Sequence, residues 1–403
     1  MLIVQKFGGT SVGDLDRIQN VANRVQKTVQ EGHQVVVVVS AMSGETNKLV
    51  GYAEHFSSNP SAAEVDMLLS SGERVTASLM SIALNEMGLP TVAMTGRQAG
   101  IITTSKHTKA RIEEINPKLM QEALDSGKIV VVAGFQGVND KGVITTLGRG
   151  GSDLSAVAIA GALDADLCEI YTDVNGIYTT DPRIEPKAKK LDKISYEEML
   201  EFASMGAKVL QNRSVEMAKK LNVNLVTRSS FTDEEGTLIT KEENIMEQPL
   251  VSGVALDRNQ ARVSIIGVAD RPGIAADIFN TLAKDEINVD VILQTVAHDG
   301  TTNIDFTVPT NELELAKGIV QSFEAKDEVK SSDYNEAIAK VSIVGVGMKS
   351  HAGVAAKAFS TMAEENINIR MISTSEIKVS MVIEEKYAEL AVRSLHNAFE
   401  LDK

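Results

Sequence analysis

The amino-terminal residues of this chain are suited to binding phosphate. An apolar stretch at residues 2–7 contains one lysine, Lys6, and ends at Phe7, which is followed by Gly8, Gly9, Thr10 and Ser11. Two glycines let the backbone turn sharply and approach a ligand closely. We expect the amide groups of residues 8–11 to point outward at a helix start, where phosphate is favoured. The Walker sequence G-x-x-x-x-G-K-[ST] does not occur in the chain. A tight strand-to-helix turn beside an exposed lysine is the alternative interpretation.

A second cluster, residues 146–153, reads Thr-Leu-Gly-Arg-Gly-Gly-Ser-Asp. Arg149 lies between glycines, and a guanidinium group binds a carboxylate or a phosphate through two hydrogen bonds. Ser152 and Asp153 stand where a helix is expected to begin, so helix capping is the alternative interpretation for both. Capping does not explain Arg149. Because glycine loses more conformational entropy on folding than other residues, a plain turn would not need so many glycines. The cluster therefore indicates an anion-binding site.

Two further polar clusters follow apolar or helical stretches. Residues 40–47 come directly after five consecutive valines, and residues 70–74 lie inside a helical stretch that glycine would weaken. Ser40, Thr46 and Glu73 are the candidate binding residues in these clusters. A surface pair between Glu73 and Arg74 is the alternative interpretation for the second cluster.

A fifth cluster, residues 172–178, contains Thr172, Asp173 and Tyr178, and Arg183 follows closely. The Asn-Gly pair within this cluster is ordinary turn chemistry, so a surface loop is the alternative. Lys208 is predicted to open a helix, where the helix dipole disfavours lysine, and this position favours a functional reason for the residue. The six histidines show no spacing typical of metal ligands.

The clusters lie between alternating strands and helices, which predict a layered α/β sheet covered on both faces. Five consecutive valines, residues 35–39, are typical of a central strand that is buried on both sides. In such sheets ligands bind beyond the carboxyl ends of the strands, and the polar clusters fall there. We expect strands at residues 3–7, 34–40, 91–95, 129–133, 143–146, 167–172 and 224–227. We expect helices at residues 14–31, 46–56, 64–87, 117–126, 153–163, 195–204 and 208–221.

The last third of the chain contains an internal repeat. Residues 232–249 are polar and acidic and read as a linker or connecting hairpin, after which the pattern of residues 263–289 recurs at residues 341–369. Each copy reads as strand, glycine turn, helix and further strands, which suits a ferredoxin-like unit. The amides at Gly273 could meet a carboxylate at the helix start, and Asp270 or Asp290 could meet an amino group. An amino-acid effector fits both ends, and a ligand-free duplication is the alternative.

Composition excludes several classes of protein. The 403 residues predict two to three domains, and the net charge of -15 argues against nucleic acid or an anionic membrane as the main partner. The single cysteine, Cys168, excludes an intrachain disulfide and a cysteine-based metal site, and its apolar setting predicts a buried thiol. We see neither a membrane-spanning run nor a signal peptide, so the expected compartment is the cytoplasm.

Taken together, the ordered clusters and the tandem repeat resemble the aspartokinases, amino-acid kinases that phosphorylate aspartate with ATP. The resemblance covers essentially the whole chain. It implies a layered αβα amino-acid-kinase domain with a mainly parallel sheet, followed by two ferredoxin-like ACT domains of the βαββαβ type. The implied boundaries are residues 1–240 for the kinase domain, 241–253 for a linker, 254–330 for the first ACT domain and 335–403 for the second.

The resemblance also implies roles for individual residues. Lys6, Asp153 and Lys208 would be catalytic, with the two lysines stabilising the transferred phosphoryl group and the aspartate orienting them. Mg²⁺ would bridge the ATP phosphates, with no metal ligand from the protein. The implied ATP-binding residues are Lys6, Phe7, Gly8, Gly9, Thr10, Ser11, Thr172, Asp173, Tyr178, Arg183 and Lys208. The implied substrate-binding residues are Ser40, Thr46, Glu73, Arg149, Gly150 and Ser152, with Arg149 holding a carboxylate and Glu73 the amino group.

The family's ACT pair binds the end products lysine or threonine, so the resemblance implies feedback control. The implied effector residues are Asp270, Gly273, Ile274, Ala275, Asn288, Val289, Asp290, Gln294, Val354, Ala355, Asn368, Ile369 and Ser375. A homo-oligomer through the ACT domains is expected, with a shorter ACT-only chain as a possible partner. Two alternatives stay open: a carboxylate kinase of the same fold that acts on glutamate, and a non-catalytic amino-acid sensor.

Overall fold

The computed structural model describes residues 1–204, 209–245, 249–269, 271–296 and 301–403. Within these ranges the chain forms two compact units, which we call the first unit and the second unit. The first unit contains residues 1–177, 190–204 and 209–245. The second unit contains residues 178–189 and the described residues from 249 to 403. No helix within the described ranges is long and apolar enough to span a bilayer.

The main sheet of the first unit has eight strands among the described residues, in the order β10-β12-β11-β9-β1-β2-β6-β3. Its neighbouring strands pair in parallel, except β11 and β12, which are antiparallel. The valines of β2 are fully buried, as a central strand requires. The strands are β1 (Leu2–Phe7), β2 (Gln34–Val39), β3 (Thr91–Met94), β6 (Ile129–Ala133), β9 (Leu167–Thr172), β10 (Lys193–Ser195), β11 (Leu225–Ser229) and β12 (Thr237–Thr240).

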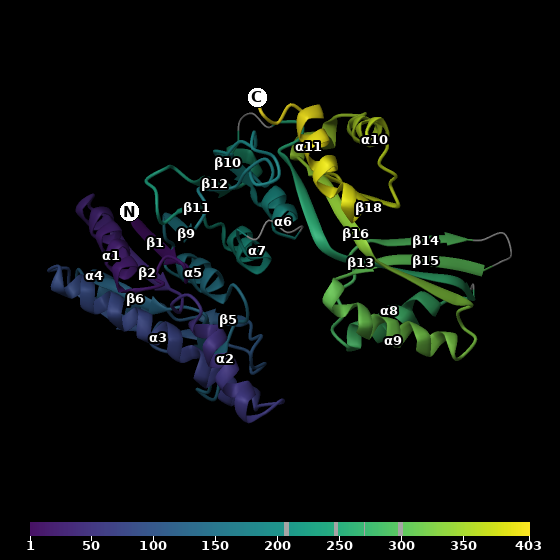
Figure 1. Ribbon diagram of the computed structural model, residues 1–403. Helices are drawn as coiled ribbons and strands as arrows, with labels where there is room; N and C mark the ends of the chain where they lie inside the picture. The colour runs from purple at the N-terminus through teal and green to yellow at the C-terminus, as the bar shows by residue number, and fades with distance from the viewer. Residues whose placement is uncertain (205–208, 246–248, 270, 297–300) are drawn as a thin grey trace. The chain divides into compact units, whose positions relative to one another are not determined.

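Helices cover both faces of this sheet. On one face, apolar side chains of α1 and α3 pack against alternate valines of β2 and against Phe7. On the other face lies α5, a helix whose residues are nearly all buried and which packs against β1 and β9. The helices of the first unit are α1 (Leu15–Gln30), α2 (Glu45–Phe56), α3 (Ala62–Glu86), α4 (Lys118–Asp125), α5 (Gly151–Ala162), α6 (Tyr196–Ser204) and α7 (Asn212–Leu221). Figure 1 shows these elements in purple to teal.

A small second sheet in the first unit was only partly predicted. Among the described residues it has four strands in the order β5-β4-β7-β8, with bounds β4 (Ile101–Thr103), β5 (Ile112–Ile115), β7 (Gln136–Val138) and β8 (Ile144–Thr146). Only β8 was expected from the sequence. The other three strands have three or four residues each, shorter than a typical strand and too short for a clear alternating pattern.

Of the two interpretations of residues 232–249, a linker or a connecting hairpin, the structure confirms a hairpin strand, because β12 pairs antiparallel with β11 and lies in the main sheet. Strand β10 was not predicted. The helix expected from residue 208 begins at Asn212, and residues 209–211 precede it; Lys208 itself lies outside the described residues.

The second unit is built on a six-stranded antiparallel sheet, counted over the described residues, in the order β14-β15-β13-β16-β18-β17. Figure 1 shows α8 and α9 side by side along one face of β13–β15, in green. The strands are β13 (Gly253–Ala269), β14 (Ile292–Val296), β15 (Thr301–Val308), β16 (Ser331–Val344), β17 (Met371–Thr374) and β18 (Lys378–Glu384). The helices are α8 (Ile274–Lys284), α9 (Leu313–Glu324), α10 (Val354–Glu364) and α11 (Ala388–Ala398).

The two repeats share their central strands. Strands β13 and β16 pair along almost their whole length, from Gly253 opposite Val344 to Ile266 opposite Ser331. The start of β13 therefore lies in the sheet of the second repeat, although it precedes the first repeat in the chain. Each repeat has its own apolar core, one between α8, α9 and the sheet and one between α10, α11 and the sheet.

Residues 178–189 group with the second unit, whereas the expected kinase domain ran continuously from 1 to 240. The physical reason lies in their contacts. The carbonyl of Thr179 accepts a hydrogen bond from the Val254 amide at 2.7 Å, and its hydroxyl lies 2.9 Å from Nε2 of His396. The side chain of Ile184 packs against the apolar core of the second repeat.

Candidate active site

The structure brings the two strongest sequence clusters together at an ion pair. Nζ of Lys6, on β1, lies 2.5 Å from Oδ1 of Asp153, in the first turn of α5. The two side chains are only 10% and 11% exposed. A Cβ atom on Gly8 would lie 3.4 Å from the lysine Nζ, so the ammonium group lies over the glycine turn. A buried ion pair beside a glycine turn is an arrangement that can neutralise charge on a phosphoryl group.

The glycine turn is held by its own backbone. The amides of Ser11 and Val12 donate to the carbonyl of Gly8 at 2.9 and 3.3 Å, and the Gly8 amide donates to the carbonyl of Tyr171 at 3.3 Å. A Cβ atom on Gly9 would lie 2.9 Å from the Ala41 carbonyl oxygen, closer than real contacts allow. Only glycine fits this position, because its backbone lies directly against the loop that follows β2.

The helix after this turn begins within one residue of the expected position and not at the glycine turn itself. Helix α1 begins at Leu15, and its N-cap is Asp14, whose carboxylate accepts the Arg17 amide at 2.8 Å. Residues 8–11 therefore form a turn ahead of the helix, and the prediction that their amides form the helix start was wrong. The physical reason is that Asp14 is a strong N-cap residue placed three residues after Ser11.

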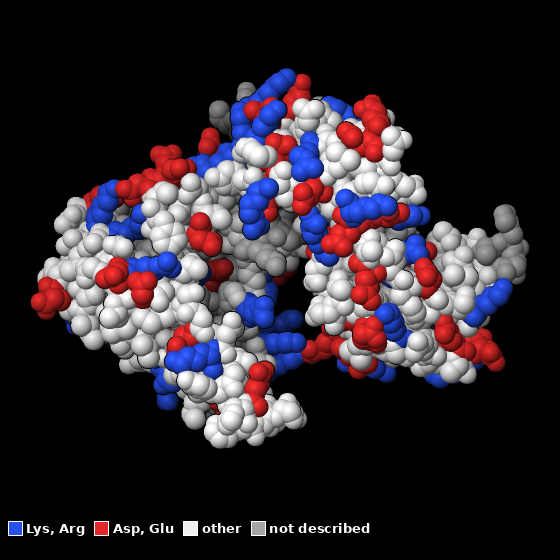
Figure 2. All heavy atoms as spheres, viewed as in Figure 1, with Lys and Arg blue, Asp and Glu red and all other residues white. Residues whose placement is uncertain are grey.

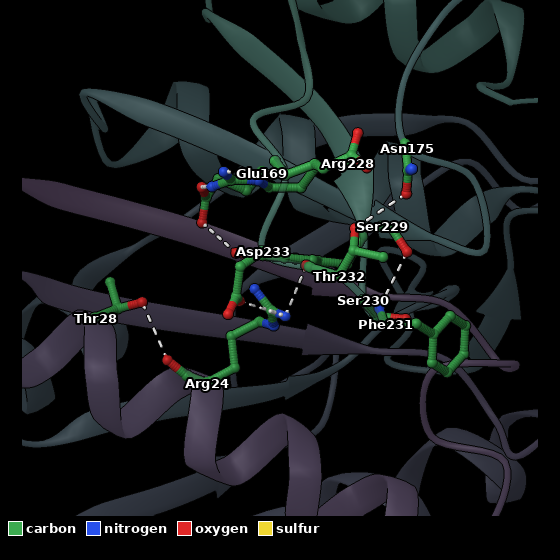
Figure 3. A network of polar contacts seen from close by, with 12 residues as sticks. Arg24, Thr28, Glu169, Asn175, Arg228, Ser229, Ser230, Phe231, Thr232 and Asp233 are labelled. Atoms are coloured by element: carbon green, nitrogen blue, oxygen red, sulfur yellow. Dashed lines mark hydrogen bonds and ion pairs between the residues drawn. The ribbon is translucent and has the colours of Figure 1, made fainter.

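Figure 3 shows a network of polar side chains that includes Arg24, Glu169 and Arg228. Phe7 stacks on Tyr171 with ring centroids 4.6 Å apart, and the guanidinium groups of Arg24 and Arg228 lie 5.3 and 6.0 Å from the Tyr171 ring centroid. The Tyr171 hydroxyl donates to Glu169, which also binds Arg228 at 2.8 Å. Burial raises the pKa of the Tyr171 phenol, so this hydroxyl stays a donor.

The loop after β11 is tied to both candidate nucleotide-binding segments. Ser11 donates through its hydroxyl to the Ser230 hydroxyl at 2.8 Å, and Ser230 donates to the Thr172 carbonyl at 3.2 Å. Figure 3 shows Ser230 between Ser229 and Phe231 in this loop, and Thr232 bonded to Asn175. Arg228 and Ser230 were not among the residues predicted from the sequence. The polar Thr-Arg-Ser-Ser sequence at the carboxyl end of a strand was the signal that could have found them.

Glu73 is buried on α3 and is not part of a surface pair. It is 4% exposed, and its Oε1 accepts the Ala41 amide at 3.1 Å, while Arg74 donates to the Ser70 carbonyl instead. Within the described part of the chain its Oε2 has no hydrogen-bond partner. Burial raises the pKa of Glu73 to about 7. A buried carboxylate with one unpaired oxygen is suited to receiving an ammonium group.

Arg149 and its neighbours form an open turn ahead of α5. Gly148 and Gly150 have φ values of 79° and 69°, which favour glycine, and Arg149 between them is exposed. The N-cap of α5 is Gly150, and in the described structure no side chain caps this helix. The capping interpretation of Ser152 and Asp153 was therefore wrong: Asp153 binds Lys6, and Ser152 is buried against Gly134.

The remaining predicted site residues fall into three groups. In the loop after β2, the Ser40 amide donates to the Phe7 carbonyl at 3.1 Å, and Thr46 lies half-buried in the first turn of α2. At the end of β9, Thr172 accepts the Val174 amide through its hydroxyl, and Asp173 is exposed. Tyr178 and Arg183 belong to the second unit, where Arg183 binds Asp181 at 2.7 Å and lowers the pKa of that carboxyl group.

The predicted effector residues occupy equivalent places in the two repeats. Gly273 and Gly353 are the N-caps of α8 and α10, with φ values of 98° and 95°. Asp270 lies outside the described residues. Ile274 and Val354 are buried, Ala275, Ala355, Val289 and Ile369 are half-buried, and the exposed members are Asn288, Asp290, Gln294, Asn368 and Ser375.

One predicted effector residue already has a partner. The carboxylate of Asp290 is paired with the ammonium group of Lys340, which lies on β16 and is 3% exposed. The equivalent position in the second repeat is Arg370, which binds Glu384 at 2.8 Å. The described residues contain no group of three or more His, Cys, Asp or Glu side chains that could hold a metal ion.

Comparison with known proteins gives matches along the chain. Residues 1–228 match the model of the amino acid kinase family, and residues 262–325 and 341–399 match two ACT domain models. An aspartokinase of Helicobacter pylori is 59% identical over the full length of both chains. An aspartokinase of Corynebacterium glutamicum is 47% identical, over 99% of this chain and 96% of that one. The structure of Escherichia coli aspartokinase III with aspartate and ADP covers 99% of both chains, with 28% identity and a TM-score of 0.84.

Proposed function

Since the chain belongs to the amino acid kinase family and is an aspartate kinase, we propose that it transfers the γ-phosphoryl group of ATP to the side-chain carboxylate of L-aspartate. A carboxylate oxygen attacks the γ-phosphorus, the bond to the bridging oxygen of ADP breaks, and 4-phospho-L-aspartate forms. No proton has to move, because both the nucleophile and the leaving group are anions. The site must therefore bring two anions together, which is mainly a task of positioning and charge neutralisation.

The observation that carries this proposal is the buried pair of Lys6 and Asp153 beside the glycine turn. The Lys6 ammonium lies over Gly8, where it would meet the transferred phosphoryl group. Asp153 fixes the ammonium, so the charge is in place before the substrates bind. We assign Lys208 the same role as Lys6 from the sequence alone.

We assign nucleotide binding to the turn at residues 8–11 and to Thr172 and Asp173. Gly8 and Gly9 carry no side chain, and the Lys6 ammonium lies beside Gly8, which suits a phosphate cradle. The nucleotide role that the resemblance implies for Tyr178 and Arg183 stays a prediction. Mg²⁺ carried by the ATP phosphates would neutralise their charge, and the protein's part is to hold the lysine beside them.

We assign the substrate's two ends to Glu73 and Arg149. Glu73 has a buried, unpaired carboxylate oxygen for the ammonium group, and Arg149 has an exposed guanidinium for a carboxylate. Ser40, Thr46, Gly150 and Ser152 complete the assigned pocket. A relative from Escherichia coli has been solved with aspartate and ADP, and this supports the assignment of both substrates.

We further propose that lysine, threonine or both inhibit the enzyme by binding the second unit, and that the reaction serves lysine, threonine and methionine biosynthesis. Escherichia coli aspartokinase III has been solved with lysine and aspartate, and this supports lysine as an effector. The glycine N-caps of α8 and α10 have open space around them, which suits the carboxylate of an amino acid. The proposed assembly is a homo-oligomer through the ACT repeats.

The proposed reaction is tested by its product. Purified enzyme is given ATP and Mg²⁺ with L-aspartate, with L-glutamate or with no acceptor, and hydroxylamine traps any acyl phosphate as a hydroxamate. We expect the β-hydroxamate of aspartate in amounts equal to the ADP released. Turnover with glutamate in place of aspartate, or the α-hydroxamate as product, would refute the proposed acceptor. Asp153→Asn tests the ion pair and is expected to reduce kcat.

A further inference from the structure

A second buried carboxylate on α3, Asp66, is not used by the reaction as proposed. Its side chain is 0% exposed. It accepts hydrogen bonds from the Thr146 hydroxyl at 2.5 Å, from the Thr108 amide at 3.1 Å and from Nδ1 of His107 at 2.7 Å. A buried carboxylate is costly unless it is fully hydrogen-bonded. Asp66 meets that condition with three donors that come from two other segments.

Those two segments belong to the substrate side of the site. His107 and Thr108 lie in the connection between β4 and β5, and Thr146 ends β8, three residues ahead of Arg149. The connection between β4 and β5 also packs against the turn that carries Arg149. The approach is close, since a Cβ atom on Gly148 would lie 3.2 Å from the Thr108 carbonyl oxygen. The backbone contributes a further bond, from the Ala110 amide to the Thr146 carbonyl at 2.9 Å. Asp66 therefore anchors the base of the turn that carries Arg149.

The same helix face carries Glu73. Seven residues separate Asp66 from Glu73, which is close to two full turns of an α-helix, so both side chains project from one face about 10 Å apart. Both are buried on that face. Helix α3 thus carries Glu73, which is assigned to the substrate's ammonium group. Through Asp66 the same helix also holds the turn of Arg149, which is assigned to the substrate's carboxylate. The spacing between the two ends of the substrate site depends on this connection.

We propose that Asp66 and His107 are positioning residues for aspartate binding, which hold the Arg149 turn at a fixed distance from Glu73. This inference rests on the proposed assignment of Glu73 and Arg149 to the substrate. The two residues are proposed to affect the binding of aspartate and not of ATP. Among the described residues, none of those assigned to the nucleotide forms a hydrogen bond with Asp66. His107 acts through its Nδ1–H group, which donates to Asp66. An asparagine in place of His107 would put a side-chain amide N–H group close to the position of the histidine Nδ1–H group.

The experiment measures KM for aspartate and for ATP separately. Asp66→Asn keeps the shape but loses the charge, His107→Leu removes the donor, and His107→Asn restores a donor. Glu198→Gln is the matched control, because Glu198 is also a buried, hydrogen-bonded carboxylate in the first unit. We expect Asp66→Asn and His107→Leu to raise KM for aspartate about tenfold, with KM for ATP changed by less than about twofold. His107→Asn and Glu198→Gln should stay within about threefold of the unmodified enzyme.

Equal increases in both KM values, or no increase for aspartate, would overturn the proposal, since a purely structural role makes no distinction between the substrates. If Asp66→Asn does not fold, Thr146→Val decides, because it removes one donor and leaves the carboxylate in place. Calorimetric titration with aspartate gives a readout independent of turnover. If the unmodified enzyme neither binds nor phosphorylates aspartate, the proposed function has failed. If the unmodified enzyme binds and phosphorylates aspartate and the variants have the same KM for aspartate, only this inference has failed.

Discussion

The candidate active site and the candidate effector sites are built in opposite ways. In the first unit two of the charged groups are buried and held by other protein groups, Lys6 by Asp153 and Glu73 by the backbone of the loop after β2, whereas Arg149 is exposed. In the second unit most polar members of the predicted sites are exposed on loops and strand edges. Asp290 is exposed as well, but the buried Lys340 already pairs with its carboxylate.

This difference reflects what each site has to do. Charges that stabilise a transition state act best when they are fixed before the substrate arrives. A regulatory site has to change when its ligand binds, and a ligand changes an equilibrium only through its different affinity for the two states. Figure 2 shows acidic and basic side chains interspersed over the visible surface. We therefore expect changes in the two regions to separate turnover from inhibition.

The largest effect is expected for Lys6→Ala. Removing the ammonium group leaves the transferred phosphoryl charge and Asp153 without a cation, and kcat should fall about 10³-fold. Binding of lysine or threonine, measured by calorimetry, should not change. Lys128→Ala, which removes an exposed lysine ahead of β6, is the control and should leave kcat unchanged. Residual activity within tenfold of the unmodified enzyme would remove Lys6 from the catalytic role.

Glu73→Gln should weaken aspartate binding and stabilise the fold. Loss of a charged hydrogen-bonding partner is expected to raise KM for aspartate about 30-fold. For the same reason, KM of the unmodified enzyme should rise as the pH falls below about 7, the pKa of Glu73. Inhibition by an effector should stay the same. A flat pH profile for the aspartate KM would show that Glu73 does not hold the ammonium group.

The stability effect of Glu73→Gln has a definite sign. Burial raises the pKa of Glu73 from 4.5 to about 7, so ionising it destabilises the folded state increasingly as the pH rises between these values. Above pH 7 glutamine should therefore raise the free energy of unfolding by up to about 3 kcal/mol. At pH 4.5 the difference should vanish. Urea unfolding at both pH values measures it, and equal effects at both would show that the buried charge is not what destabilises the fold.

Asp290→Asn tests the effector site. We expect the affinity for an amino-acid effector to fall about tenfold while kcat without effector is unchanged, because the carboxylate is the assigned partner of the amino group. Lys340→Met is the informative partner variant. It removes the ion that competes for Asp290, so effector binding should tighten. Both are measured with lysine and with threonine as probes, and parallel losses in the two variants would mean that the ion pair is only structural.

The smallest effect is expected for Arg370→Ala. Arg370 stands in the second repeat where Asp290 stands in the first, and it forms an exposed ion pair with Glu384. Exposed pairs contribute about 0–1 kcal/mol to stability, and we expect less than a twofold change in inhibition. A large loss of inhibition would instead place an effector at the second repeat.

Much of the fold followed from periodicity and apolar runs. The valine run of β2 predicted a central strand correctly, and the expected strand at residues 167–172 has the same bounds as β9. The strands that were missed, such as β7, have too few residues to show a pattern. The site is harder to predict because its chemistry depends on distant contacts. Nothing near Glu73 in the sequence shows that it is buried against Ala41, and the donors to Asp66 lie 41 and more residues away.

The shared central strands of the second unit constrain how the chain can fold. The residues that complete the sheet of the second repeat, at the start of β13, pair with partners about ninety positions later. Closing so long a loop costs conformational entropy before any contact offsets it. The sheet of the second repeat therefore cannot be completed until the start of β13 has paired with the end of β16. Because these partners lie so far apart in the chain, we expect the second repeat to form late and slowly.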